Sequence, residues 1–296
     1  MHAPVRPVRG RWPALLESTP LRRFLRLDPL TILDDEADPA SFREAMSSIY
    51  VGGTIKITGA DRHPETDQLL IDTVDLSEAA IVDIGASDGS TSLDLIERLP
   101  AFSSYTIADL YLRLRAVTVG GRTLLFTDDD TCVLVVGPRA MAWPAESAAV
   151  ARLYARLVRT AAAQLPSSRE VLLLNPAVRR LMSTDPRVSH RVHDVFDVWP
   201  DDDPTSSRPD VIKVANLLRR LYFDDANLLR ALHALRDSLP EGGSLMLVDN
   251  PRLEDPSPRA GIWRREGDVF VEAARIGEPE IADLVARVGR DELIPR

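Results

Sequence analysis

Short apolar runs and helical stretches alternate along most of this chain of 296 residues. From residue 79 onward, runs such as AAIVDI, SYTIAD, PDVIKVA and SLMLVD read as buried strands. Between the last two lies FDDANLLRALHALRDSL, which has leucines on one helical face and Asp224 or Asp225 as its cap. Strands that alternate with helices predict a parallel sheet covered by helices.

The first 78 residues show a different pattern, which predicts a mainly helical N-terminal cap region. Asp38 can cap a helix that has Pro39 at its first position, and a second helix should start near Pro64. Between these helices, VGGTIKITG reads as a loop with a short strand. We expect the rest of the chain, residues 79–296, to form one larger domain.

A β-rich stretch interrupts the larger domain at residues 114–137. Its runs are split by Gly120-Gly121 and by three consecutive aspartates, a pattern typical of a small antiparallel meander. An amphipathic helix follows, so the whole insertion should span about residues 112–167. We expect the meander to lie outside the main sheet.

The C-terminal part completes the predicted fold. GIWRREGDVFVEAARIG reads as a hairpin that turns at Glu266-Gly267. Residues 261–277 would then form an antiparallel edge on the sheet. The predicted fold class is α/β, with a Rossmann-like, doubly wound sheet of seven mostly parallel strands.

Composition and charge narrow the functional classes. The chain is 45% hydrophobic, which suits a globular core, and its net charge of −9 with a pI of about 5.2 disfavours nucleic acid as a partner. No apolar run approaches the roughly 18 residues of a membrane span, and the N-terminus lacks the apolar segment of a signal peptide. We therefore expect a cytoplasmic protein with neither membrane nor nucleic-acid partners. Cys132, the only cysteine, cannot form an internal disulfide.

Two acidic runs, TDDDT and WPDDDP, superficially resemble metal sites. Consecutive aspartates between turn-forming residues are usually solvated loops. The stretch KVANLL, which ends another predicted strand, contains no acidic residue either. We expect no bound metal.

The stretch IVDIGASDGS, residues 81–90, passes from a buried strand into a glycine-containing turn. Glycines let the backbone approach a ligand without a Cβ atom in the way. A dinucleotide-binding turn would need glycines at 87 and 90, where this chain has Ser87 and Ser90. A phosphate-binding loop would need a Gly-Lys-Ser/Thr ending, which is absent.

The run from Asp83 to Gly89 resembles motif I of the class I S-adenosylmethionine-dependent methyltransferases, with Ser87 in place of the central glycine. Residues 210–250 resemble the fourth strand, long helix, Pro-x-Gly-Gly turn and fifth strand of that family. This block is also similar to the chemotaxis-receptor methyltransferases, whose substrate we do not carry over. The resemblance covers roughly residues 79–110 and 168–290.

The resemblance implies S-adenosylmethionine as the cofactor and a set of residues that hold it. The methionine moiety would lie on the glycine turn, with its ammonium held by Asp83 directly or through a water molecule. The ribose would lie at the end of the second strand, the adenine after the third strand, and the methyl group near the end of the fourth strand. These residues are Asp83, Gly85, Ala86, Ser87, Gly89, Asp109, Leu110, Asp194, Val195, Phe196, Asn216 and Leu217.

Two assignments stay open at this point. Asp109 lies twenty positions after Gly89 and suits the ribose hydroxyls, but EVLLLNPAVRRLM also resembles the second strand and would put Asn175 there. Near the adenine, Asp197 is the second choice after Asp194. The spacing favours Asp109.

The family resemblance implies methyl transfer to an O, N or C atom of a small molecule. The alternatives are non-methylating chemistry with the same cofactor, such as cyclisation or decarboxylation, and a non-catalytic binding or scaffold role. A homodimer is a further partner that we consider. The sequence offers only weak candidates for a base and for substrate contacts. These are His190, His193, His233 and Tyr222 for catalysis, and Tyr50, Arg219, Tyr222 and Trp263 for the substrate.

Overall fold

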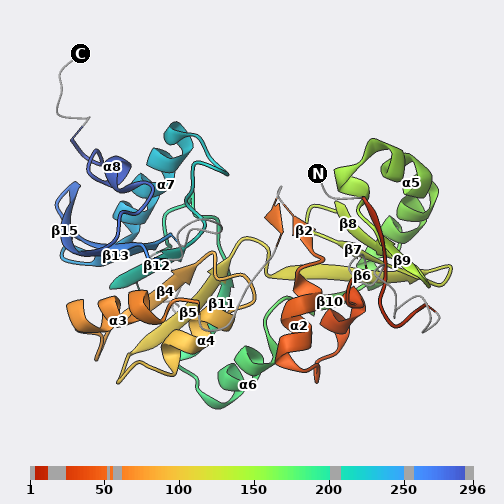
Figure 1. Ribbon diagram of the computed structural model, residues 1–296, viewed down its shortest axis with the longest axis horizontal. Helices are drawn as coiled ribbons and strands as arrows, with labels where there is room; N and C mark the ends of the chain where they lie inside the picture. Colours follow the sequence, from red (N-terminus) through yellow and green to blue (C-terminus); the bar gives the residue numbers. More distant parts are fainter. Residues whose placement is uncertain are drawn as a thin grey trace. The chain divides into compact units, whose positions relative to one another are not determined.

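The computed structural model describes residues 4–12, 25–51, 54–55, 62–200, 208–249 and 257–290. The chain forms two compact units, one of residues 1–59 and 111–179 and the other of residues 60–110 and 180–296 (Figure 1). We call them the six-stranded unit and the seven-stranded unit. This division differs from the boundary predicted after residue 78, because the N-terminal segment supplies a strand to the sheet of the inserted region.

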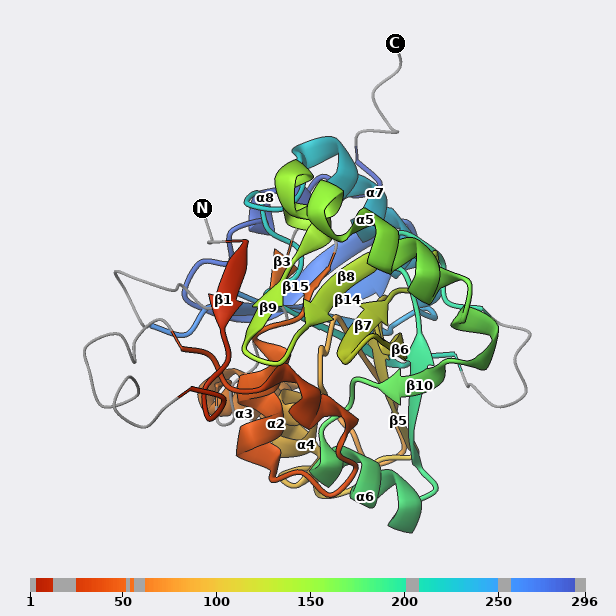
Figure 2. The same ribbon diagram turned by 90° about the vertical axis from the view of Figure 1, so that its right-hand side faces the viewer.

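The six-stranded unit is built on an antiparallel sheet in the order β1-β9-β8-β7-β6-β10 (Figure 2). One face packs on α5 (Ala148–Ala162) and the other on α2 (Pro39–Met46) and the 3-10 helix η2 (Pro29–Leu33). Both faces are therefore covered, as expected for the continuous apolar run CVLVV. The strands are β6 (Arg113–Val119), β7 (Arg122–Phe126), β8 (Cys132–Val136), β9 (Ala140–Ala142) and β10 (Arg169–Leu172).

The predicted meander is confirmed as an antiparallel unit outside the seven-stranded sheet, but the sheet is larger than expected. Strand β1 (Val5–Pro7) pairs with β9 at its edge, so the N-terminal region is less helical than predicted. Pro4 and Pro7 disfavour a helix and are tolerated on an edge strand. A two-stranded hairpin of β2 (Tyr50–Val51) and β3 (Thr54–Ile55) follows α2.

The seven-stranded unit has the strand order β11-β5-β4-β12-β13-β14-β15. The first five strands are parallel, and β14 and β15 add an antiparallel hairpin at the edge, as predicted. The strands are β4 (Ala80–Ile84), β5 (Ser104–Asp109), β11 (Val188–Val192), β12 (Val211–Ala215), β13 (Ser244–Val248), β14 (Ala260–Glu266) and β15 (Val269–Ile276).

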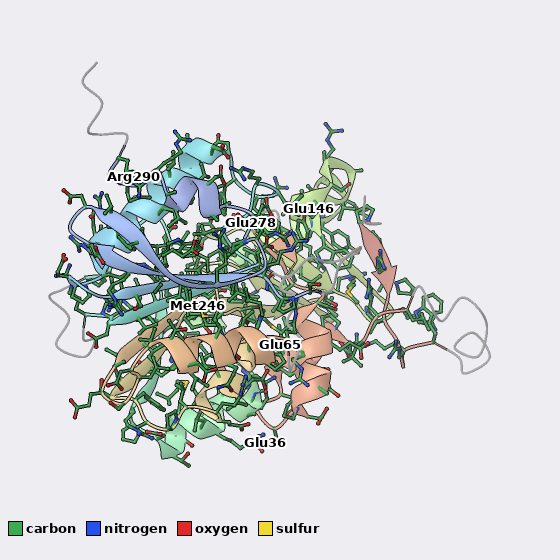
Figure 3. All side chains as sticks on the ribbon, turned by 60° about the vertical axis from the view of Figure 1, so that its left-hand side comes forward. Glu36, Glu65, Glu146, Met246, Glu278 and Arg290 are labelled. Carbon is green, nitrogen blue, oxygen red and sulfur yellow. The ribbon has the colours of Figure 1, made fainter. Side chains whose placement is uncertain are left out.

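Helices cover both faces of this sheet (Figure 1). Helices α7 (Asp225–Ser238) and α8 (Ala282–Val285) pack on one face through a hydrophobic cluster. Helices α3 (Pro64–Thr73) and α4 (Ser90–Ile96) supply side chains that bond to the strands on the other face. Figure 3 labels Met246 on that second face and Glu65 on the exposed side of α3.

The chain changes direction across the sheet between β4 and β12. From β4 it continues to β5 on one side, and it later returns to β12 on the other side of β4. Such a reversal in an open α/β sheet is the place where ligands bind, beyond the carboxyl ends of the strands. The turn at residues 85–89 leaves β4 at that point.

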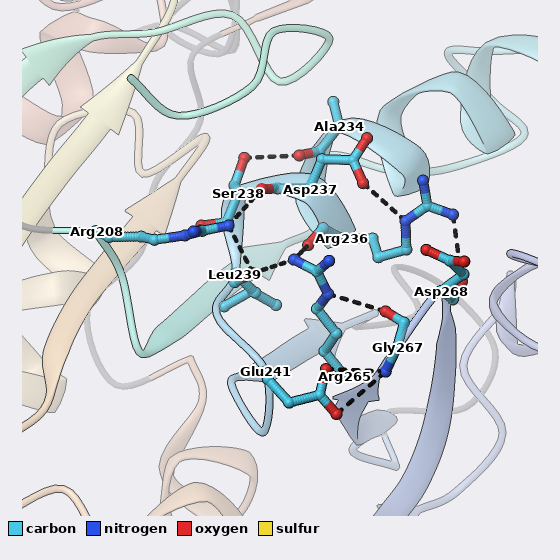
Figure 4. A network of polar contacts seen from close by, with 10 residues as sticks. All are labelled: Arg208, Ala234, Arg236, Asp237, Ser238, Leu239, Glu241, Arg265, Gly267 and Asp268. Atoms are coloured by element: carbon cyan, nitrogen blue, oxygen red, sulfur yellow. Dashed lines mark hydrogen bonds and ion pairs between the residues drawn. The ribbon is translucent and has the colours of Figure 1, made fainter. Parts of the chain in front are cut away.

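Two arginines donate hydrogen bonds to backbone oxygens at the C-terminal end of α7 (Figure 4). Arg208 donates to the backbone oxygens of Asp237 and Leu239 at 2.9 and 3.1 Å. Arg265 of β14 donates to the backbone oxygens of Arg236 and Leu239. The last carbonyls of a helix have no partner within the helix and carry its negative dipole end, so guanidinium groups suit them well. This clamp ties α7 to the antiparallel hairpin.

Gly261 in β14 offers a test of how tightly this hairpin is packed. A Cβ atom there would lie 2.2 Å from Cη2 of Trp263, whose ring is buried in the core. Because a buried indole ring cannot move aside cheaply, we expect Gly261→Ala to lower the free energy of unfolding by about 2–3 kcal/mol. Denaturant unfolding followed by circular dichroism measures this loss.

The matched control is Gly267→Ala in the turn of the same hairpin. Nothing lies within 4 Å of a Cβ atom there, and only the positive φ of 59° opposes the substitution. We expect a loss of about 1 kcal/mol. Equal losses at the two positions would contradict the packing of Trp263 over Gly261.

Candidate functional site

The candidate site lies at the carboxyl edge of the five parallel strands in the seven-stranded unit. A chain of contacts joins the strand ends along this edge. The backbone N–H of His193 after β11 donates to the carbonyl of Asp109 in β5 at 3.3 Å. At the other end, Asn216 after β12 donates its N–H to Val248 of β13 at 2.8 Å. The turn after β4 lies between these two contacts.

Left-handed backbone shapes the turn after β4. Gly85 and Gly89 have φ of 78° and 76°, and Ser87 between them has φ of 59°. Glycine adopts this conformation freely, whereas a residue with a Cβ atom pays for it. The motif that this stretch resembles has a glycine at the position of Ser87, which suits a left-handed φ. In this chain Ser87 is therefore a strained residue at the centre of the turn.

Gly85, directly after β4, packs against Leu217, which lies two residues after β12. A Cβ atom at Gly85 would lie 2.8 Å from Cδ2 of Leu217. Leu217 follows Asn216, which also has a left-handed φ of 58°. Asparagine tolerates this conformation better than most residues. Two loops with left-handed backbone thus meet at the reversal of strand order, where Gly85 packs against Leu217.

Asp109 ends the strand next to β4 and contacts the turn directly. Its Oδ2 accepts the backbone N–H of Ser87 at 2.9 Å, and the side chain is 8% exposed. The rival residue Asn175 follows β10, which belongs to the six-stranded sheet, and its amide caps α6 (Pro176–Thr184) at Ala177. Asp109, and not Asn175, therefore ends the second strand of the parallel sheet. Leu110, 42% exposed, follows at the same edge.

Asp83 does not point into this edge. Its Oδ2 accepts hydrogen bonds from the hydroxyls of Ser92 at 2.8 Å and Tyr105 at 3.1 Å, and the residue is 1% exposed. Residues alternate between the two faces of a strand, and Asp83 falls on the face covered by α3 and α4. The expected contact between its carboxylate and a ligand ammonium is thus not what the geometry favours. A motif cannot show on which face an acid lies.

The loop after β11 forms a compact turn. Asp194 Oδ1 accepts the backbone N–H of Phe196 at 3.0 Å, while Val195 is buried in the core. The ring of Phe196 meets the ring of Phe223 edge-on, with centroids 5.3 Å apart. Asp194 and Phe196 are both half-buried, so the two side chains are partly accessible in this loop.

The loop after β12 carries an ion-pair network that the sequence reading missed. Arg219 lies 3.3 Å from Asp249 Oδ1 and 3.2 Å from Glu280 Oε2. Asp249 follows β13 directly, and its Oδ1 has no hydrogen bond among the described residues. An acid at the end of an apolar strand, as in SLMLVD, was the available signal. Arg219 is held by two carboxylates here, beside Tyr222, which is half-buried.

The remaining weak candidates are scattered. His193 is buried against Trp199, and burial lowers its pKa, so its ring is a neutral core element. His190 lies inside β11 and His233 lies in the third turn of α7, away from the strand ends. Trp263 belongs to the hydrophobic core and not to a pocket. Tyr50 belongs to β2 of the six-stranded unit.

The acidic runs have the following places. Asp128–Asp130 form the turn between β7 and β8, where Asp130 pairs with Arg115 and Asp129 accepts from Thr127 and Thr131. The run at 201–203 falls outside the described residues. Among the residues that are described, no group of three His, Cys, Asp or Glu side chains is arranged to hold a metal ion. Nor does any helix in the described ranges have the length and apolarity to cross a membrane.

No protein-family model matches this sequence, and no curated protein matches it. Several solved structures do resemble it. The mitomycin 7-O-methyltransferase MmcR is 19% identical over 77% of this chain and 44% of its own, with a TM-score of 0.35. An O-methyltransferase family 2 protein from Planctomyces limnophilus is 16% identical over 58% and 32%, with a TM-score of 0.29.

A third similar structure is an S-adenosylmethionine-dependent methyltransferase of putative assignment from Methanococcus maripaludis, 13% identical over 63% of this chain and 54% of its own, with a TM-score of 0.32. The chain thus spans 32–54% of the length of these structures. At such TM-scores the likeness carries no functional argument. The function has to be inferred from the geometry of the site.

The strain at Ser87 can be measured. We expect Ser87→Gly to raise the free energy of unfolding by about 0.5–1 kcal/mol, because glycine removes the cost of a left-handed φ. Urea unfolding of the two proteins gives the difference. Ser87→Ala keeps the Cβ atom at the same φ and should bring no gain. A loss of stability in Ser87→Gly would show that contacts of the serine hydroxyl outweigh the backbone strain.

Proposed function

We propose that this chain binds S-adenosylmethionine at the carboxyl edge of the seven-stranded sheet and transfers its methyl group to a small molecule. One observation carries the proposal. At the reversal of strand order, the backbone of Gly85 packs against the side chain of Leu217, and the acid Asp109 ends the adjacent strand beside the same turn. A glycine turn next to a strand-end acid suits a ligand with an adenosine moiety and no phosphate.

The residues of the edge divide the cofactor between them. The turn of Gly85, Ala86, Ser87 and Gly89 would hold the methionine moiety. Asp109 would accept the ribose hydroxyls: a carboxylate offers about four acceptor positions, so the bond from Ser87 is compatible with this role. Asp194 and Phe196 would receive the adenine, with the apolar ring against its face.

The bound cofactor would supply a methyl group already activated by a sulfonium. What this chain must add is alignment of the acceptor with the methyl group and exclusion of water. Asn216 and Leu217 lie at the strand end where the methyl group would point. Tyr222 is the one weak base candidate that lies in the loop after β12. A carboxylate acceptor would need no base, and we propose a metal-independent reaction.

The proposal also covers the type of sheet, the class of acceptor, the cellular location and the oligomeric state. We propose a Rossmann-like, doubly wound description for the seven-stranded unit, supported by helices on both faces and by the switch between β4 and β12. The net charge of −9 supports a small-molecule acceptor over nucleic acid. A cytoplasmic location and a homodimer remain proposals of the same kind.

Calorimetry with S-adenosylmethionine and S-adenosylhomocysteine tests the binding step. Binding of both at a 1:1 ratio supports the proposal, and no binding by the folded protein would refute it. Product mass after incubation with candidate acceptors and labelled cofactor then separates methyl transfer from cyclisation or decarboxylation. Binding without any turnover across a broad acceptor screen would favour the scaffold role.

Asp109→Ala tests the ribose contact. Hydrogen bonds to a charged group contribute about 1.5–3 kcal/mol each. We therefore expect a loss of about 10–100-fold in affinity for S-adenosylhomocysteine, at tenfold per 1.4 kcal/mol. Because Asp109 is buried and bonds to Ser87, some loss of stability should accompany it, contrary to what a solvated strand-end acid would show. Isothermal titration calorimetry gives the affinity and thermal unfolding gives the stability.

Asn175→Ala is the matched control. Asn175 follows a strand and, like that of Asp109, its side chain accepts a backbone N–H, but it belongs to the six-stranded unit. Its affinity for S-adenosylhomocysteine should equal that of the unmodified chain within about twofold. Weaker binding in Asn175→Ala with unchanged binding in Asp109→Ala would refute the assignment of Asp109.

A further inference from the structure

A buried polar network lies under the glycine turn, on the face of the sheet covered by α3 and α4. Asp83, Lys213 and Asp67 are 1%, 0% and 2% exposed. Lys213 of β12 is the register partner of Asp83 of β4, so both side chains leave the sheet on one face. Lys213 Nζ donates to Asp67 Oδ1 of α3 at 2.8 Å. Three ionisable groups thus meet inside the seven-stranded unit.

The hydroxyls around Asp83 complete the network. Ser92 Oγ donates to Asp83 Oδ2 at 2.8 Å and Tyr105 Oη donates to the same oxygen at 3.1 Å. Burial and the carboxylate of Asp83 raise the pKa of Tyr105 well above its ordinary value, so the phenol keeps its proton and remains a donor. Burial, Lys213 and Arg62 lower the pKa of the neighbouring His63 to about 3, so its imidazole is neutral.

Such a network is an expensive way to stabilise a fold. Removing charged groups from water has a large free-energy cost, and well-packed hydrophobic side chains of similar volume often stabilise a fold equally well. The opposite face of the same sheet is packed with hydrophobic side chains, which form an apolar cluster under α7 and α8. The polar face therefore calls for an explanation in terms of position.

The geometry supplies this explanation. Asp83 stands two residues before Gly85, where the turn begins, and Ser92 stands three residues after Gly89, where it ends. One carboxylate oxygen thus binds the two ends of the turn together. Tyr105 adds the neighbouring strand β5, whose last residue Asp109 bonds to the turn at Ser87. Hydrogen bonds to Asp83 Oδ2 thus connect the strand before the turn, the helix after it and the neighbouring strand β5.

We propose that Ser92 and Tyr105 are positioning residues that act through Asp83 to hold the glycine turn in its ligand-binding shape. The inference rests on the proposed function and assigns Asp83 a place behind the cofactor instead of in contact with it. Lys213, the register partner of Asp83, donates to Asp67 Oδ1 and so joins α3 to the same buried network.

The test compares single hydroxyl deletions on the two sides of the seven-stranded sheet. Tyr105→Phe and Ser92→Ala each remove one donor to Asp83 in the full chain. The control is Thr106→Val, which removes a hydroxyl bonded at 3.1 Å to Ser189 on the opposite face of β5. Calorimetry measures the affinity for S-adenosylhomocysteine, and denaturant unfolding measures stability for every variant.

We expect Tyr105→Phe and Ser92→Ala to weaken binding about 5–20-fold, while Thr106→Val stays within about twofold at a comparable loss of stability. Amide hydrogen exchange over residues 85–89 should quicken in the first two variants and not in the control. The double variant should lose less than the product of the single losses, because both hydroxyls serve one oxygen.

Unchanged affinity in folded Tyr105→Phe and Ser92→Ala would overturn the inference while leaving the proposed function intact. Equal weakening in Thr106→Val would also overturn it, since the effect would then follow stability alone. Absence of binding by the unmodified, folded chain would instead refute the proposed function, and this inference with it.

Discussion

The packing of the turn after β4 against Leu217, which follows β12, is the constraint on which the carboxyl edge of the seven-stranded unit depends. The parallel strands β4 and β12 end side by side, and the chain must turn away from the sheet within a few residues after each of them. Left-handed backbone at Gly85, Ser87, Gly89 and Asn216 makes these turns short enough. The turn packs against the side chain of Leu217 and bonds to Asp109 through the backbone N–H of Ser87, so both neighbouring strand ends fix its position.

The two faces of the sheet meet this constraint in different ways. Under α7 and α8 the packing is apolar, and hydrophobic contact is tolerant of small shifts in direction. Under α3 and α4, hydrogen bonds converge on Asp83, and hydrogen bonds weaken steeply when their angles change. The apolar face thus supplies stability, whereas the polar face sets direction at the residues that lead into the turn.

The sequence predicted elements better than it predicted partners. The alternation of strands and helices, the antiparallel hairpin and the caps at Asp38 and Asp224 all follow from local pattern, and the structure has them. The face on which Asp83 lies and the burial of Trp263 depend on which strands are neighbours, and spacing along the chain does not contain that information. Strand β1 was missed for the same reason, since its three residues become a strand only through pairing with β9. The choice between Asp109 and Asn175 likewise required strand pairing, because both end apolar runs.

Strand pairing also explains how a long segment can interrupt the chain between β5 and β11. The segment leaves after Leu110 and begins with β6, and it ends with β10 before α6. Strands β6 and β10 pair with each other, so that Arg113 lies opposite Leu172, and Leu173 donates to Leu112 at 2.7 Å. Neighbouring strands in a sheet lie about 4.8 Å apart, so the first and last strands of the inserted segment begin and end close together. The inserted segment can therefore connect β5 to α6 as a short loop would. The crossover from β5 to β11 keeps a helix, α6, as parallel strands require, whatever the length of the chain folded between them.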